Sequence, residues 1–152
     1  MDPVQLHLML NQILIFGVVF VILFFIISYF LSNNLLINIS LIMVIIIALW
    51  AIATHQSGEV AEEFVKTLPV YPEKLVQDHD IAADVAFIFI VIVGVFAILS
   101  LIARKYNKEL VHFLTTITLL LLIIGGLLLA RAAYIGVNIH NPEFFPSFFI
   151  FR

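Results

Sequence analysis

The sequence predicts an all-α fold, an integral membrane four-helix bundle with a long polar loop between its second and third helices. The 152-residue chain is 64% hydrophobic and 11% charged, whereas soluble domains carry about 45–50% apolar and about 25% charged residues. Four apolar stretches approach or exceed the ~20 residues that a helix needs to cross a bilayer. One polar segment, residues 54–84, holds seven of the ten acidic residues. A chain of this length is expected to form a single domain, residues 1–152.

Start and stop signals divide the chain into its helices. Asp2 is suited to cap the first helix and Pro3 to occupy its first turn. Residues 32–34 form a short polar turn, and Pro69 and Pro72 break the chain before the third helix. The predicted helices span residues 3–31, 35–53, 80–102 and 110–134, and the polar loop spans 54–79.

Some smaller features bear on packing. Within the polar loop, residues 58–68 are expected to be helical, either as an extension of the second helix or as a short surface helix. The aromatic tail, residues 144–151, suits a membrane interface. Glycines inside apolar helices allow close packing between helices, and this role is predicted for Gly17, Gly94, Gly125 and Gly126.

Composition excludes several classes of protein. The chain has no cysteine, which excludes disulfides, thiolate metal ligands, iron–sulfur clusters and covalently attached c-type haem. A formal net charge of -3 gives no reason to expect nucleic acid as a partner. The first residues lack a basic region and a small-residue cleavage site, so we do not expect a removable signal peptide.

The distribution of basic residues predicts an orientation. Four spans place both termini and the long polar loop on one side of the membrane. The turn at residues 104–108 packs three basic residues into five positions. Cytoplasmic loops carry an excess of Lys and Arg. We therefore expect a multi-pass protein of the bacterial inner membrane, with the termini and the long loop in the periplasm.

This topology collects histidines in one layer. Four of the five histidines fall at the outer ends of the four predicted helices, and only His112 falls at the other face. Nine of the ten acidic residues share the outer side. There is also a weak two-fold pattern, because each hairpin enters and leaves the membrane near a histidine. The four outer histidines are His7, His55, His79 and His140.

Helical spacing brings carboxylates beside these histidines. His55 and Glu59 are four residues apart, and Glu59 is followed by two further glutamates one turn later. Neutral imidazole with carboxylate suits zinc, copper or iron, and imidazoles from two helices could ligate haem b. So many carboxylates could instead handle protons, and a solvated polar surface is the plain alternative. The predicted metal ligands are His7, His55, Glu59, Glu62, Glu63 and His79.

Asp84 and Arg131 are charged residues inside predicted spans. An unpaired charge in hydrocarbon costs at least about 2.5–3.5 kcal/mol. We therefore expect the two to form an interhelix ion pair, or to act as cofactor-binding residues with Arg131 holding an anionic group.

Three short motifs resemble those of a family of small bacterial four-helix membrane proteins, a domain of unknown function. The family pattern is H-x-x-x-N-H-x-P, then T-G-E-x-A-E-E, then H-E-x-x-A, matched here at residues 7–14, 57–63 and 79–83. Gln12 replaces a second histidine and Leu14 replaces the proline. The resemblance implies no established activity. It implies a shared outer site on His7, Glu59, Glu62 or Glu63, and His79.

These observations favour a membrane protein that binds a metal ion or haem, linked to respiratory electron transfer. The alternative is a non-catalytic structural or assembly subunit of a larger membrane complex, for which the small size and apolar helices are suited. A homo-oligomer is compatible with either. Neither G-x-S-x-G nor H-E-x-x-H occurs, so no catalytic residue is assigned and an enzyme is the less favoured interpretation.

Overall fold

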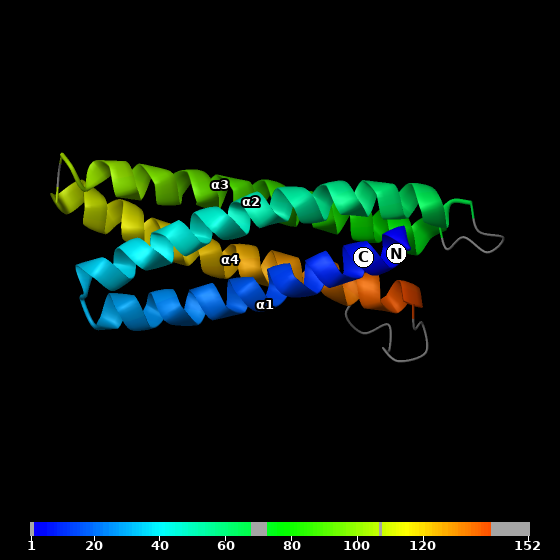
Figure 1. Ribbon diagram of the computed structural model, residues 1–152, viewed down its shortest axis with the longest axis horizontal. Coiled ribbons are helices and arrows are strands. Elements are labelled where there is room, and N and C mark those ends of the chain that lie inside the picture. Colours follow the sequence, from blue (N-terminus) through cyan, green and yellow to red (C-terminus); the bar gives the residue numbers. More distant parts are fainter. Residues whose placement is uncertain (1, 68–72, 107, 141–152) are drawn as a thin grey trace.

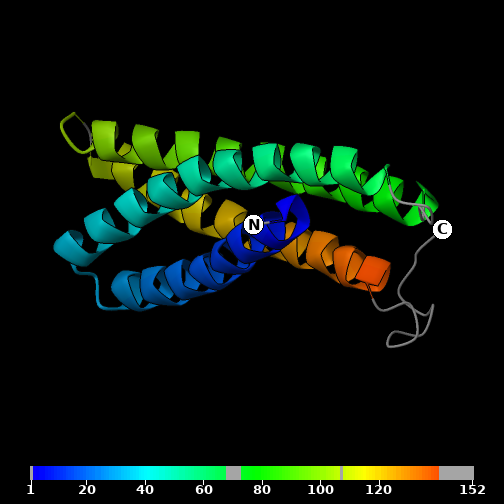
Figure 2. The same ribbon diagram turned by 45° about the vertical axis from the view of Figure 1, so that its right-hand side comes forward.

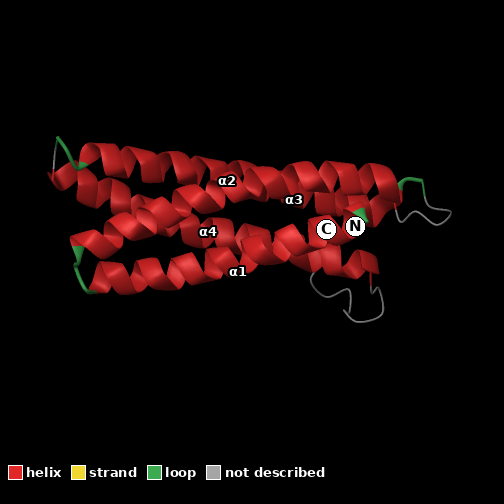
Figure 3. Ribbon diagram, in the orientation of Figure 1, coloured by secondary structure: helices red, strands yellow, loops and turns green. Residues whose placement is uncertain are grey.

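The computed structural model describes residues 2–67, 73–106 and 108–140 (Figure 1). This part of the chain is almost entirely helical and contains no strand (Figure 3). The predicted aromatic tail and both proline breaks lie outside the described residues. The helices are α1 Pro3–Phe30, α2 Asn34–Val65, α3 Glu73–Ala103 and α4 Lys108–His140.

The four helices form an antiparallel bundle. Helices α1 and α2 make one hairpin, and α3 and α4 make the other (Figures 1 and 2). Each helix packs against its neighbours in sequence, and α1 packs against α4, although less extensively. Helices α1 and α3 are therefore diagonal partners. The polar end of the bundle is defined here as the end that contains the start of α1, the end of α2, the start of α3 and the end of α4.

The predicted cap at Asp2 is confirmed, whereas Asn33, predicted only as part of a short turn, caps the second helix. The Asp2 carboxylate accepts a hydrogen bond of 3.0 Å from the backbone N–H of Val4. The Asn33 side chain accepts hydrogen bonds from the backbone N–H groups of Leu35 and Leu36. These caps satisfy donors that have no partner within the helix. In the turn before Asn33, Ser32 adopts a left-handed backbone conformation with φ 49°.

The polar loop is shorter than the predicted 54–79, and of the two alternatives for residues 58–68 the structure shows the extension of the second helix, as far as Val65. Helix α2 continues through residues 54–65, and α3 already begins at Glu73. The predicted boundary followed the end of the apolar stretch, but a helix ends only where a cap or a proline ends it. No proline occurs before Pro69, and Lys66 Nζ lies 2.7 Å from Glu62 Oε1, one turn apart. Helix α4 likewise extends beyond residue 134 to His140.

All four helices are long and apolar enough to cross a membrane. Their outer surfaces are apolar as well as their inner ones: Phe16 is 73% exposed and Leu127 is 68% exposed. Water would solvate such a surface poorly, whereas lipid matches it. The buried core lies in the middle of the bundle and is made of aliphatic side chains and Phe25.

The predicted close-packing glycines are confirmed, and each lies at a different helix interface. A Cβ atom at Gly17 would come within 2.7 Å of Ile47 Cδ1 between α1 and α2. One at Gly94 would come within 2.5 Å of Ala48 Cβ between α3 and α2. The remaining two contacts are Gly125 with Ile90 of α3 and Gly126 with Ile22 of α1.

The two hairpins are approximate structural repeats. Ser28 of α1 and Ser40 of α2 share a buried hydrogen bond of 3.2 Å, and Ser100 of α3 and Thr118 of α4 share another of 3.2 Å. The chain separation from Ser28 to Ser100 is the same as that from His7 to His79. Buried core positions follow the same register: Leu14 with Ala86, Val18 with Ile90, Val21 with Val93, and Phe25 with Ala97.

Candidate functional site

His7 lies at the polar end in the contact between α1 and α2. Its Nδ1 atom is 3.3 Å from the backbone oxygen of Thr54 and 3.0 Å from the Ser57 hydroxyl. The Ser57 hydroxyl itself donates to the Thr54 oxygen at 2.7 Å. A Cβ atom at Gly58 would lie 3.1 Å from His7 Cε1. The imidazole can therefore pack against α2 because Gly58 has no side chain.

His79 has the equivalent position in the second hairpin. Its Nδ1 atom is 2.9 Å from the backbone oxygen of Ala132 on α4. A Cβ atom at Gly136 would lie 3.0 Å from His79 Cε1. In both hairpins the histidine therefore meets a glycine and the backbone oxygen of the residue four positions before that glycine. The two-fold pattern expected from the sequence thus includes the surroundings of the histidines.

The two imidazoles lie close together across the bundle in a T-shaped arrangement. Helices α1 and α3 are diagonal, yet the ring centroids of His7 and His79 are only 6.4 Å apart, and the ring planes are nearly perpendicular at 77°. Both side chains are partly buried. Facing helices of a four-helix bundle commonly supply cofactor and metal ligands in this way.

Hydrogen bonding assigns the proton on each ring. A backbone oxygen can only accept, so Nδ1 of His79 donates to Ala132. At His7 the Ser57 hydroxyl donates its proton to the Thr54 oxygen, so it cannot also donate to the ring. His7 Nδ1 is therefore a donor as well. In the neutral form of each ring, Nε2 then carries the lone pair. An Nδ1–H bound to a backbone oxygen is the usual arrangement for a histidine that ligates a metal through Nε2.

His55 belongs to a separate group. Its ring stacks on Phe87 of α3 with a centroid distance of 4.2 Å and an interplanar angle of 5°. Its Nε2 lies 3.7 Å from Glu59 Oε1 and its Nδ1 lies 3.8 Å from Asp84 Oδ1. Both carboxylates are more than half exposed. His55 therefore joins α2 to α3 through stacking and weak, water-screened ion contacts.

The expected pairing of Asp84 with Arg131 is not present. Asp84 lies beside His55 instead, and Arg131 is exposed on α4. Arg131 directly precedes Ala132, which is buried and meets His79, so consecutive positions of the helix place Arg131 on a different face. The inference from charge alone did not account for the helix face on which each residue lies.

The other predicted ligands are distributed around the polar end. Glu62 forms the ion pair with Lys66, and Glu63 is exposed. The side chain of His140 lies outside what the structure describes. Among the side chains that the structure describes, no three histidines or carboxylates are grouped closely enough to hold a metal ion together. The arrangement therefore offers one close pair of imidazoles.

The sequence predicted both histidines of this pair as ligands, but the glycines and backbone oxygens that position the two rings were not predicted. Gly58 appeared only as part of a motif, and Gly136 and the backbone oxygens of Thr54 and Ala132 were not singled out. The available signal was register: the separation from Gly58 to Gly136 equals that from Thr54 to Ala132 and from Ser40 to Thr118.

Two other polar or hollow features lie away from the pair. At the opposite end, the Tyr29 hydroxyl lies 2.8 Å from Thr116 Oγ1 and 3.3 Å from His112 Nε2. Partial burial lowers the pKa of the nearby turn residue Arg104 from its ordinary value.

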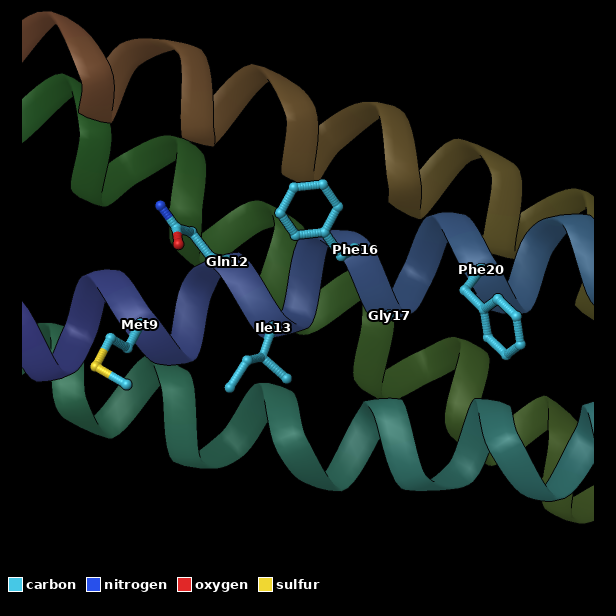
Figure 4. Close-up of a pocket in the computed structure, with 6 residues that line it drawn as sticks. All are labelled: Met9, Gln12, Ile13, Phe16, Gly17 and Phe20. Atoms are coloured by element: carbon cyan, nitrogen blue, oxygen red, sulfur yellow. The ribbon is translucent and has the colours of Figure 1, made fainter.

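An open depression runs along α1 and contains none of the predicted ligands (Figure 4). It is lined by Met9, Gln12, Ile13, Phe16, Gly17 and Phe20.

Comparison of the chain with known protein families, with curated proteins and with solved structures finds no match. The resemblance to the bacterial four-helix membrane family therefore rests on its three motifs.

Proposed function

We propose that this protein crosses a membrane four times and binds a metal centre, either a single ion or haem iron, through His7 and His79 at its polar end. The observation that carries the proposal is the close approach of two imidazoles from diagonal helices, 6.4 Å between centroids. Metal–imidazole bonds are about 2.0–2.1 Å long. Two such bonds plus half the width of each ring are compatible with the observed separation.

The chemistry of the two rings supports the same conclusion. Each ring has its Nδ1–H directed at a backbone oxygen, which leaves Nε2 as the available ligand atom. Imidazole suits zinc, copper and iron. A redox-active metal here would suit a component of respiratory electron transfer, as the sequence suggested.

Metal analysis of the detergent-purified protein tests this proposal. We expect about one bound metal per chain, counted as zinc, copper or iron, in the wild type. His7→Ala and His79→Ala each remove one of two ligands and should abolish it. His112→Ala is the matched control, because His112 lies at the opposite end and contacts Tyr29; its metal content should remain that of the wild type.

A metal-free, colourless wild type that is as stable as both variants would contradict the proposal. The alternative function, a structural or assembly subunit, would then be favoured, and its partners would be expected to co-purify. Equal metal content in wild type, His7→Ala and His79→Ala would also contradict the proposal, because it would place the metal elsewhere.

The proposed orientation can be tested with single cysteines, because the chain has none of its own. Thr67→Cys follows the end of α2 and Lys105→Cys lies in the turn after α3; both positions are exposed. In bacterial spheroplasts, a membrane-impermeant maleimide should label Thr67→Cys, and should label Lys105→Cys only after lysis. The reverse pattern would place the polar end in the cytoplasm.

A further inference from the structure

We infer that the group held between His7 and His79 is an iron porphyrin, with the two histidines as its axial ligands. This inference rests on the proposed function and specifies the ligand class of that site. The first argument is the number of ligands. A bare zinc ion takes three or four protein ligands, whereas an iron porphyrin requires only axial ligands from the protein.

The described polar end supplies two ligands and no third. The three glutamates expected to complete a metal set are engaged or exposed: Glu62 pairs with Lys66, Glu59 lies beside His55, and Glu63 is exposed. Among the described residues no group of three such side chains forms. A centre that takes two imidazoles and provides its remaining ligands itself matches this arrangement.

The second argument is the size of the neighbouring side chains. Next to the histidines, most buried positions of α2, α3 and α4 carry small residues, with Val76 and Leu129 as the larger exceptions. A large planar group between the two rings would therefore meet mostly small side chains. The small positions are Ala51, Thr54, Gly58, Ala61, Ala82, Ala86, Ala132 and Gly136.

The third argument is symmetry. An iron porphyrin presents two equivalent axial positions, one on each face. His7 and His79 occupy equivalent positions of two repeated hairpins, each with Nδ1 on a backbone oxygen and each against a glycine. The ring planes can differ by 77° without affecting ligation, because each ring can rotate about its own bond to the iron.

The test is a titration of the purified, detergent-solubilised protein with ferric haem, followed by visible absorption and electron paramagnetic resonance. We expect one haem per chain with a low-spin ferric signal, the signature of two imidazole ligands. His7→Ala and His79→Ala should lose the low-spin signal, and His112→Ala should keep it. His79→Met is a second variant that can still ligate iron; it should retain haem with a changed spectrum and a raised reduction potential.

The outcomes separate this inference from the proposed function. Stoichiometric zinc or copper that is lost in both histidine variants, with no low-spin haem, would overturn the porphyrin and leave the metal site standing. Binding of neither ion nor haem would overturn both. Haem bound equally by the double variant His7→Ala/His79→Ala would be partition into the micelle or the apolar surface, and would also overturn the inference.

Discussion

Replacing Gly136 by alanine is expected to weaken metal or haem binding by about 10–100-fold, the range found when the partners that orient a metal ligand are disturbed. The new Cβ atom would lie 3.0 Å from His79 Cε1 and 3.1 Å from its Nδ1. The imidazole must move away, and the movement disturbs the 2.9 Å hydrogen bond from Nδ1 to Ala132. Both histidines remain in the chain, so the effect would arise from ring position alone.

The matched control for this variant is Gly126→Ala. It lies on the same helix, and its new Cβ atom would have the same clearance of 3.0 Å, but to Ile22 Cδ1 of α1. Gly126→Ala should therefore bind metal or haem as the wild type does. The measurement is the dissociation constant from a titration of both variants. Equal affinities in the two variants would show that the position of the His79 ring does not matter for binding.

Replacing Gly94 by alanine is expected to destabilise the bundle by about 1–3 kcal/mol, the usual cost of overpacking a core. The new Cβ atom would lie 2.5 Å from Ala48 Cβ, an atom fixed to the backbone of α2. Helices α2 and α3 must therefore move apart. Alanine gains up to about 1 kcal/mol over glycine in helix propensity, so a net loss requires the steric term to exceed that gain.

Two further variants isolate the steric term. In Gly94→Ala/Ala48→Gly the methyl group moves from α2 to α3 and the propensity changes cancel, so stability should return close to that of the wild type. Gly17→Ala would approach the flexible end of Ile47 at 2.7 Å and should cost less than Gly94→Ala. Unfolding in detergent, followed by circular dichroism, measures all four proteins. A stable Gly94→Ala, or a double variant no better than the single one, would contradict the described contact between α2 and α3.

The sequence was sufficient for the number of helices, the cap at Asp2, and the glycine contacts. Each of these depends on local chemistry or on the apolar period. The sequence left open whether residues 58–68 extend the second helix, because the change from apolar to polar residues after Ala53 marks where the surroundings change. It does not mark where backbone hydrogen bonding stops.

The candidate site was predictable only in part. Topology alone brought His7 and His79 to one end of the bundle. It could not show which of four outer histidines meet, because that depends on the rotation of each helix about its own axis. The same limitation explains Asp84, whose helix face directs it to His55 rather than to Arg131. The register between the two hairpins indicates which residues meet. It can be recognised only once the buried positions of each helix are known.

In the proposed function, His7 and His79 bind one and the same metal centre through Nε2. Pulsed electron paramagnetic resonance of the protein loaded with copper(II) or ferric haem, prepared with ¹⁵N-labelled histidine, tests this most directly. It counts the histidine nitrogens bonded to the metal. The account predicts two in the wild type and in His112→Ala, and fewer than two in either single variant, His7→Ala or His79→Ala. Two coordinated histidine nitrogens that persist in His7→Ala or in His79→Ala would contradict the claim.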